Sequence, residues 1–333
     1  MRLEYSNTML DLLSVGAIKL DIFVPVPKAT IIGDPHGTEA KMAIDYGKKT
    51  PVRAPFVTQI AGSAPNVAVG LAKMRLKTGV VSIMGEGLIY REALDFLKQH
   101  RVDTRNVKKQ PGTRSSSAVV LNYKGESTQL VDHAPQIYRL PSSARAKFLH
   151  ISELGEGYEA LFADAIKLAK RTKTKISFNP GSIQIEERKD IFFKLLKVTN
   201  VLFLNMAEAK KVLGSPKTQS LVDLMRDLKA LGSTLVVVTD GKKGAYAFDG
   251  KRLVYVPMFP GPRVEATGAG DAFSIGFLGA LLKGKSAGEG LRWGAVNSAS
   301  VVGQIGPTAG LLSSVEIKSR LKARATYKVK IIN

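Results

Sequence analysis

Cysteine is absent from this chain of 333 residues, so neither a disulfide framework nor a thiolate metal site can form. A reducing compartment fits this composition. The histidines are few and scattered, and they do not make a zinc cluster; they are His36, His100, His133 and His150. The sequence therefore offers no metal centre built on soft ligands.

A secretion signal is also absent. Residues 1–21 carry Glu4 and Asp11, and they lack a basic region, a long apolar core and a small-residue cleavage site. No apolar run reaches the ~18 residues that crossing a bilayer requires. We therefore expect a cytoplasmic protein with no membrane partner.

Acidic residues are few beside basic ones, 28 against 49, and the formal net charge is +21. Such a charge is consistent with binding to nucleic acid, to an anionic membrane or to phosphorylated ligands. The lysines and arginines are spread along the chain, without a basic tract interleaved with aromatic residues and without a recognisable nucleic-acid motif. We interpret the charge as a generally basic, solvated surface.

Apolar segments alternate with amphipathic ones along the chain. Strands are predicted at 12–24, 79–85, 147–154, 175–180, 200–205 and 233–240, and helices at 63–76, 90–100, 158–171, 186–197 and 206–231. Continuous rather than alternating apolarity indicates strands buried on both faces, which is typical of a parallel sheet covered by helices. We predict an α/β fold, a three-layer sandwich with a mostly parallel central sheet flanked by helices.

Two segments interrupt this alternation. Residues 25–60 are rich in proline, glycine and charge, and residues 115–123 and 127–133 are extended pieces joined by a "KGE" turn, which predicts a hairpin. We expect residues 1–333 to form one domain with a small β-strand lid, made by segments around 25–60 and 112–135.

One motif in the chain is misleading. Residues 279–286, "GALLKGKS", match the phosphate-loop pattern letter for letter, but a working phosphate loop follows a strand and opens a helix. This match lies at the end of a predicted helix. We interpret Gly284 as the stop of that helix and Ser286 to Glu289 as the capping box of the next one.

The stretch "VEATGAGDAFSIGF", residues 264–277, carries the chemistry. Residues 267–270 are predicted to start a helix with unpaired backbone N–H groups that an anion can approach closely. The charge of Asp271, in the first turn, would repel a bound phosphate unless it takes a proton from a neighbouring nucleophile. An anion cradle beside a base is what phosphoryl transfer to an alcohol requires.

This stretch closely resembles the signature of the ribokinase-like (PfkB) carbohydrate kinase family, roughly D-T-x-G-A-G-D-x-F, and the resemblance extends over almost the whole chain. In that family the glycine-rich turn forms an anion hole for the transferred phosphoryl group, and its aspartate is the catalytic base. The resemblance implies an anion hole at Gly268, Ala269 and Gly270 and a base at Asp271.

The acceptor side also resembles the family. "AGSAPNVA", residues 61–68, is similar to the N-terminal signature G-G-x-x-x-N-x-A, which implies substrate contacts for Gly62, Ser63 and Asn66. Asp21, in "GAIKLD", matches the acid after the first strand that accepts hydrogen bonds from sugar hydroxyl groups. Without the resemblance, Asp21 is equally well a strand-end acid.

The donor side follows the same resemblance. "NMAE", Asn205 to Glu208, matches an N-x-x-E element that helps place magnesium and the phosphates, although the same residues also fit an ordinary helix cap. "VTDGKKGAYAF" resembles the nucleotide-binding strand and turn. The implied contacts to ATP are Asn205, Thr239, Gly241, Thr267 and Asn297, and the implied Mg²⁺ ligand is Glu208.

Four positions depart from the family pattern. Ala61 replaces the usual first glycine, and Gly87 and Tyr90 stand where Asp and Gly are usual, which implies altered acceptor contacts. Glu265 replaces the aspartate before "TGAGD" and puts in doubt a monovalent-cation site found in some members. Glu153, in "ISELGEG", is interpreted as a helix-start acid rather than a substrate contact.

The resemblance implies an ATP-dependent kinase that phosphorylates a CH2OH-type hydroxyl of a sugar or sugar derivative. A nucleoside kinase of the same family is the main alternative, with Phe23, Phe56 or Tyr123 available to stack on a base. The positive charge leaves a phosphorylated sugar open as acceptor. A non-catalytic relative that binds nucleic acid or a protein is the alternative from another class. The expected partners are ATP and a small-molecule acceptor, and a homodimer through the lid stays open.

Overall fold

Ten strands form the central sheet of the computed structural model, which describes residues 9–34, 40–52, 57–214 and 220–332. Their order is β16-β15-β14-β13-β12-β11-β10-β1-β6-β7. The strands from β13 to β7 in this order are parallel, and β14, β15 and β16 extend one edge in antiparallel register. The strands are β1 (Leu10–Val15), β6 (Thr78–Gly85), β7 (Asp103–Gln110), β10 (Ala146–Ile151), β11 (Lys175–Phe178), β12 (Val201–Asn205), β13 (Leu235–Thr239), β14 (Ala245–Phe248), β15 (Leu253–Val256) and β16 (Lys330–Ile332).

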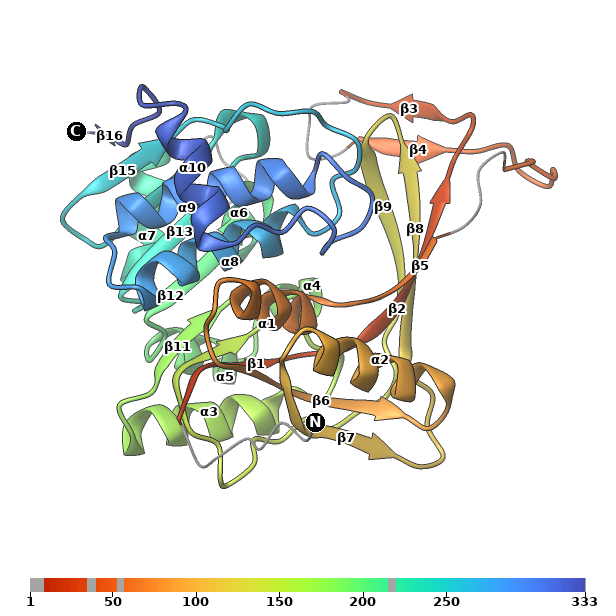
Figure 1. Cartoon of the computed structure of the whole chain (residues 1–333), viewed down its shortest axis with the longest axis horizontal. Coiled ribbons are helices and arrows are strands. Elements are labelled where there is room, and N and C mark those ends of the chain that lie inside the picture. The colour runs from red at the N-terminus through yellow and green to blue at the C-terminus, as the bar shows by residue number, and fades with distance from the viewer. Residues whose placement is uncertain (1–8, 35–39, 53–56, 215–219, 333) are drawn as a thin grey trace.

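Helices cover both faces of this sheet (Figure 1). One hydrophobic core contains side chains of α1 (Ser63–Lys73), α2 (Leu88–Gln99), α8 (Ala269–Leu282), α9 (Ala287–Val301) and α10 (Ser314–Lys322). The other contains side chains of α3 (Glu159–Arg171), α4 (Ser182–Glu187), α5 (Asp190–Leu196), α6 (Met206–Leu213) and α7 (Leu221–Ala230). Two separate cores on one sheet confirm the predicted three-layer architecture.

Strand β13 shows why continuous apolar segments fit this position. Val237 packs in the core with α8 and α9, whereas its neighbours Val236 and Val238 pack in the opposite core. Successive side chains of a strand point to opposite faces, so a strand covered on both sides needs an apolar residue at every position. The prediction of a doubly covered parallel sheet is confirmed.

A second sheet of four strands stands at the carboxyl end of β1 (Figure 1), and we call it the lid. Its order is β5-β2-β8-β9, and a short hairpin of β3 and β4 extends it. The strands are β2 (Lys19–Pro25), β3 (Thr30–Ile32), β4 (Lys41–Ala43), β5 (Val57–Ala61), β8 (Ser116–Tyr123) and β9 (Glu126–Asp132). Of the two segments expected to form a lid, 25–60 supplies β3, β4 and described residues of β5, and 112–135 supplies β8 and β9.

The predicted "KGE" hairpin is present, and the backbone conformation of its turn fits a tight hairpin connection. Lys124 and Gly125 both adopt positive φ angles, 52° and 79°, as a two-residue turn between twisted antiparallel strands requires. Strands β8 and β9 pair from the turn, where Tyr123 lies opposite Glu126, to the other end, where Ser117 lies opposite Asp132.

The single strand predicted at 12–24 is wrong, because it divides between the two sheets. Strand β1 belongs to the central sheet and β2 to the lid. The chain crosses between them at Gly16, where a Cβ atom would lie 2.2 Å from the Ser152 hydroxyl oxygen. Only glycine allows this close approach, and the crossing carries the lid out from the main body.

Two predicted helices are also interrupted. The segment 186–197 covers the end of α4 and the whole of α5, and the two helices are separated at Arg188, which has a left-handed conformation with φ 47°. The segment 206–231 contains α6, which ends at Gly214 with φ 68°, and α7. The first break has neither glycine nor proline in the sequence to mark it, whereas Gly214 and Pro216 mark the second.

The phosphate-loop match has the structure expected of a helix end. Helix α8 stops at Leu282, Gly284 adopts φ 73°, and the Ser286 hydroxyl accepts a hydrogen bond from the Glu289 amide at the start of α9.

No helix in the described part of the chain combines the length and apolar character needed to cross a lipid bilayer.

Candidate active site

Helix α8 starts at a tight turn on Gly268. Its φ angle of 78° is left-handed, and a Cβ atom there would lie 2.5 Å from the Cβ atom of Pro307. Both the backbone conformation and the close packing require glycine. The positive end of the dipole of this 14-residue helix therefore lies at the turn, open to an anion.

The backbone N–H groups of this turn divide into two sets. The amide of Thr267 donates to the Glu265 carboxylate at 2.6 Å, and the amide of Ala269 donates to the Ala266 carbonyl at 3.2 Å. The amides of Gly268, Gly270 and Asp271 have no acceptor within the described residues. Three N–H groups at one helix start are thus free for a ligand.

The carboxylate of Asp271 is held by the start of a second helix, α1. One oxygen accepts a hydrogen bond from the Asn66 side-chain amide at 2.8 Å, and the Ser63 hydroxyl donates another. Burial raises the pKa of Asp271, while these two donors and Lys19 act in the opposite direction. The arrangement keeps a carboxylate of increased basicity beside the three free amides.

The start of α1 has a conformation that brings its side chains to Asp271. Gly62 adopts φ 113°, and a Cβ atom there would lie 2.3 Å from the Ala17 carbonyl oxygen. The Gly62 carbonyl accepts the Asn66 amide at 3.1 Å, which begins the helix. The structure thus brings Ser63 and Asn66 to the acid predicted as the base, while Gly62 sets the chain path.

Lys19 and Asp21 point to the same face of β2, and both are 3% exposed. Lys19 forms an ion pair with Glu153, which follows β10. Burial alone would lower the pKa of Lys19, but the charge and hydrogen bond of Glu153 raise it. Burial raises the pKa of Asp21 to about 6, and the charge of Lys19 opposes this rise.

The interpretation of Glu153 as a helix-start acid is wrong. Helix α3 begins only at Glu159, and Glu153 instead forms the ion pair with Lys19 and lines a cavity at the carboxyl ends of β10, β11 and β12. Lys19 itself was missed by sequence reasoning. Its spacing of two from Asp21 on a strand was the available signal, because residues at that spacing share a face.

Several buried polar atoms around Asp271 have no hydrogen-bond partner. They include Oδ1 of Asp21, Oδ1 of Asn66 and Oγ1 of Thr267. Buried acceptors without a partner are rare in folded proteins, because each costs about 1–3 kcal/mol. Two of the three atoms accept hydrogen bonds only, so they fit a ligand that carries hydroxyl donors.

A cavity of about 350 Å³ is lined by Ser63, which donates to Asp271, and by Glu153, Asn205 and Glu208, among others. The Asn205 side chain accepts the Glu208 amide and the Glu208 carboxylate accepts the Asn205 amide, both at 2.8 Å. The helix cap proposed for "NMAE" is therefore formed. Burial raises the pKa of Glu208.

The donor set of this cavity fits a hard cation. The cap uses Oε2 of Glu208 and leaves Oε1 to the cavity. Mg²⁺ keeps several waters and phosphate oxygens, so one or two protein oxygens are sufficient. No group of three or more acidic or histidine side chains placed to hold a metal occurs in the part of the chain that is described.

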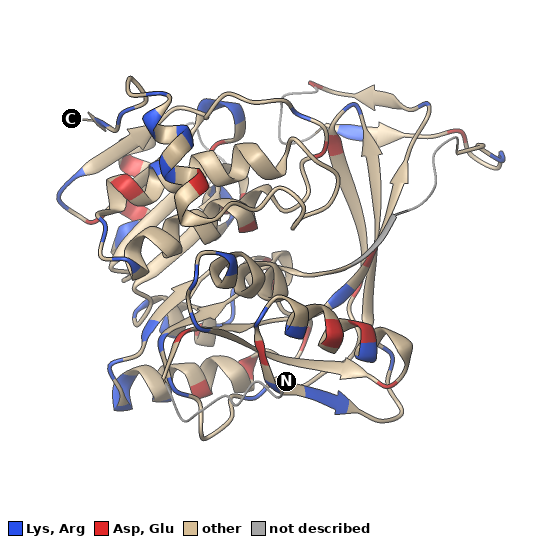
Figure 2. Ribbon diagram, in the orientation of Figure 1, with Lys and Arg blue, Asp and Glu red and all other residues tan. Residues whose placement is uncertain are grey.

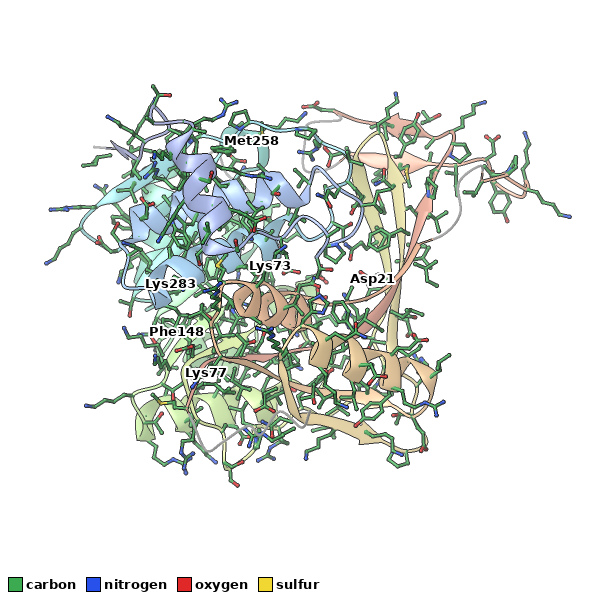
Figure 3. All side chains as sticks on the ribbon, in the orientation of Figure 1. Asp21, Lys73, Lys77, Phe148, Met258 and Lys283 are labelled. Carbon is green, nitrogen blue, oxygen red and sulfur yellow. The ribbon has the colours of Figure 1, made fainter. Side chains whose placement is uncertain are left out.

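A second cavity, of about 300 Å³, is lined by Ala269 and Gly270 at the start of α8. Thr239 and Gly241, two of the residues predicted to contact the donor, line it together with Gly270. Sequence reasoning missed most of its wall, because small and apolar residues in packed helices and loops carry no distinctive signal. The missed residues are Met258 (labelled in Figure 3), Phe259, Phe273, Ala295, Ser298, Ala299 and Val302.

Asn297 does not line this cavity. Its side chain is fully buried, donates to the Ala272 carbonyl at 2.7 Å and accepts the Leu312 amide at 2.9 Å. It therefore holds α9 against α8. Its neighbours Ser298 and Ala299 reach the cavity instead.

The aromatic residues proposed to stack on a nucleoside base differ from one another in their positions on the lid. Phe23 is 3% exposed and lies on the lid face that carries Asp21, whereas Tyr123 lies at the far end of β8 beside Lys124. Phe56 lies outside the described residues. Asp21, labelled in Figure 3, lies where the lid meets the main body.

Comparisons with known proteins agree with this geometry. The pfkB family carbohydrate kinase profile matches residues 34–313. A cytidine kinase from Thermococcus kodakarensis is 28% identical over 249 residues, covering 72% of this chain and 86% of that protein. A 5-dehydro-2-deoxygluconokinase from Bacillus subtilis is 22% identical over 302 residues, covering 85% and 93%.

A solved structure of Arabidopsis thaliana ribokinase, complexed with ribose and ATP, has the same fold. Its TM-score is 0.77 at 20% identity, over 95% of this chain and 99% of that chain. The ribokinase-like fold expected from the sequence is confirmed.

We predict that Asp21→Asn stabilises the protein at neutral pH. Because the pKa of Asp21 is about 6 in the folded chain, well above its ordinary value of 3.8, ionisation disfavours the folded state. The contribution of Asp21 to stability is complete below about pH 4 and is lost as the pH rises to about 6. The free energy of unfolding of the variant should exceed that of the wild type by about 2 kcal/mol at pH 8.

Urea unfolding between pH 4 and pH 8 measures this difference. Asp11→Asn is the matched control, because ion pairing and hydrogen bonds from Lys147 outweigh burial and lower the pKa of Asp11. That control should lose stability at pH 8. An Asp21→Asn variant no more stable than the wild type at pH 8 would contradict the analysis.

Proposed function

Because the chain belongs to the pfkB family of carbohydrate kinases, we propose that it transfers the γ-phosphoryl group of ATP to a CH2OH hydroxyl of a sugar or sugar derivative. The observation that carries the proposal is the position of Asp271, which the start of α1 holds beside three free amides of α8. A base and an anion site in contact are the two elements that this reaction needs.

Asp271 is the proposed general base. Its carboxylate accepts the proton of the acceptor hydroxyl as that oxygen attacks the γ-phosphorus, and the bond from phosphorus to the β,γ-bridging oxygen breaks. Hydrogen bonds from Ser63 and Asn66 hold the carboxylate in one orientation. Its raised pKa makes it a better proton acceptor than a surface aspartate.

The amides of the turn stabilise the charge on the transferred group. We assign this role to Gly268, Gly270 and Asp271, because Ala269 donates its amide to Ala266. These N–H groups are held by the helix before any ligand binds, so no reorganisation is needed during the reaction. The expected part of Ala269 is steric: its small side chain leaves room for the phosphate.

The two cavities together are the proposed donor site. Thr239, Gly241 and the apolar wall around Phe259 receive the nucleotide, and Asn205 and Glu208 lie where its phosphates would meet a metal. Mg²⁺, when bound, would neutralise phosphate charge and orient the γ-phosphoryl group. A donor of this kind also makes the ATP-rich cytoplasm the proposed location.

Glu265 makes a monovalent cation unnecessary in this proposal. Its two carboxylate oxygens already accept hydrogen bonds from Ser127, Thr267 and Gly306. Such a carboxylate needs no cation to be satisfied.

The acceptor is proposed to bind between the lid and Asp271. Unpartnered oxygens of Asp21 and Asn66 would accept hydrogen bonds from adjacent hydroxyl groups of a sugar or of a ribose. A nucleoside acceptor is the second candidate, because a cytidine kinase is among the similar proteins and Phe23 lies on the same face of the lid as Asp21.

A phosphorylated or acidic acceptor is disfavoured by the charges of this site. Asp21, Glu153 and Asp271 are three acids, and Lys19, the cation among them, is already paired with Glu153. A further anion would meet unbalanced negative charge. The net positive charge of the chain therefore does not extend to the acceptor site.

The basic surface alone supports the non-catalytic alternative weakly. In Figure 2, Lys and Arg are distributed over many helices and strands rather than concentrated on one face of this view. Ordered nucleic-acid binding requires a continuous basic footprint.

A homodimer through the lid is supported by the outer face of the lid sheet. Ile22, Val119 and Leu121 share that face with Leu130, which is 59% exposed. A second copy would cover these side chains. We expect the wild type to sediment as a dimer and Leu130→Asp as a monomer, and equal sedimentation of the two would contradict the proposed dimer.

We predict that Asp271→Asn loses ~10²-fold or more in kcat while its affinity for ATP stays within about threefold, as expected for loss of a general base alone. Steady-state ADP release and equilibrium ATP binding measure the two quantities. Asp95→Asn, on the exposed face of α2, is the control and should match the wild type. Near-normal turnover of Asp271→Asn would reject the assigned base.

We further predict that neutral acceptors are preferred over anionic ones. With Mg-ATP and a panel of sugars, nucleosides, sugar phosphates and sugar acids, kcat/KM for the best neutral compound should exceed that for its phosphorylated or acidic analogue by about 100-fold, because like charges in contact cost several kcal/mol. Glu153→Gln removes one acid and frees Lys19, so it should reduce this discrimination. A preference of the wild type for a sugar phosphate would contradict the charge argument.

A further inference from the structure

Glu265 joins three parts of the chain that are distant in sequence. It is 1% exposed, and its carboxylate accepts hydrogen bonds from the Ser127 hydroxyl on lid strand β9, from the Thr267 amide at 2.6 Å and from the Gly306 amide at 3.4 Å. Thr267 precedes the turn with the free amides, and the loop with Gly306 continues into Pro307, which packs on Gly268. One buried carboxylate thus touches the lid and both sides of the turn.

A second contact reinforces this junction. Glu126, next to Ser127 on β9, forms an ion pair with Arg263 at 2.6 Å. The lid turn packs on the same segment, since a Cβ atom at Gly125 would lie 3.6 Å from the carbonyl oxygens of Arg263 and Val264. The tip of the lid therefore rests on the residues that lead directly into the turn.

The side chain of Glu265 makes this junction sensitive to lid position. A buried carboxylate needs hydrogen-bond donors, because burying an unbalanced charge is costly. Two of its three donors come from the main body, and Ser127 alone comes from the lid. If the lid moves away, the carboxylate loses a donor and gains solvent, and its hold on the Thr267 amide changes.

We propose that Glu265 is a positioning residue that couples closure of the lid to the geometry of the phosphoryl-binding turn, with Ser127 as its contact on the lid. The inference rests on the proposed phosphoryl transfer at that turn. With the lid closed, Glu265 fixes the Thr267 amide and with it the direction of the Gly268 and Gly270 amides. With the lid open, the turn is less well ordered and ATP is hydrolysed less readily before the acceptor is enclosed.

The test uses Ser127→Ala with Ser117→Ala as matched control. Both serines are half-buried on the lid sheet, but Ser117 lies on the opposite face, which carries Val119 and Leu121. We expect Ser127→Ala to lower kcat for acceptor phosphorylation about tenfold, as for loss of one hydrogen bond to a charged group, with ATP affinity and thermal midpoint close to those of the control. Ser127→Thr, which keeps the hydroxyl, should restore kcat.

A second variant separates this role from a merely structural one. If Ser127 acts through Glu265, then Ser127→Ala should change kcat of a Glu265→Gln background by less than about twofold, a non-additive result. Acceptor KM and kcat are measured for all four combinations. Full additivity, or Ser127→Ala equal to Ser117→Ala, overturns the proposal.

Failure of the inference is distinguishable from failure of the proposed function. If Asp271→Asn is inactive and Ser127→Ala equals the control, the coupling is wrong while the kinase assignment stands. If Asp271→Asn keeps wild-type turnover, the base assignment fails and the inference fails with it.

Discussion

The hydrogen bonds from the start of α1 to Asp271 are the contact on which the site depends. They join two helix starts that are more than 200 residues apart in the sequence, since Asn66 and Asp271 differ by 205 positions. Close packing of the two helices maintains the contact: a Cβ atom at Gly70 would lie 2.7 Å from Ile275, and one at Gly279 would lie 2.4 Å from the sulfur of Met74. Glycines in both helices thus allow the backbones to approach until a side chain of one start reaches the acid of the other. The carboxylate is half-buried and oriented because the helices are close, and the same closeness places it at the free amides.

Much of the fold followed from local patterns in the sequence. Continuous apolar segments predicted strands such as β13, whose side chains pack in the cores on both faces of the sheet. The "KGE" turn predicted the lid hairpin. The predictions were wrong where a contact with a residue distant in the sequence decides the local conformation. The strand predicted at 12–24 divides because Gly16 passes close to Ser152, and nothing near Gly16 in the sequence reports that neighbour. The break at Arg188 is similar, since its side chain reaches the carbonyl of Lys211 on another helix.

The site was predictable to the extent that a motif carried it. Ser63 and Asn66, for which the family resemblance implied substrate contacts, lie beside Asp271, and chain spacing alone could not have predicted this contact. Glu153 and Lys19 show the limit: each has an ordinary local explanation, and they form a pair only because β2 begins next to the end of β10. Asn297 shows the converse, a polar residue near the nucleotide cavity whose hydrogen bonds are used between helices. Hydrogen-bond partners, which decide both cases, are a property of the fold.

Basic and acidic residues are distributed differently on the two sides of the turn. The proposed acceptor side holds three acids around one paired lysine, whereas a cavity of about 690 Å³ adjoining the proposed nucleotide cavity is lined by Lys41, Lys124, Lys242, Lys243 and Arg263, with Glu126 and Asp240. The two cavities share Gly241, Lys242 and Arg263. An anionic nucleotide approaching from that direction meets a positive field, which raises its local concentration and its association rate. At the turn, in the proposed complex, backbone amides rather than lysines would face the phosphate. Amides held by a helix cannot be neutralised by Asp271 as a lysine would be by an ion pair, so the base and the anion site can lie in contact without cancelling each other.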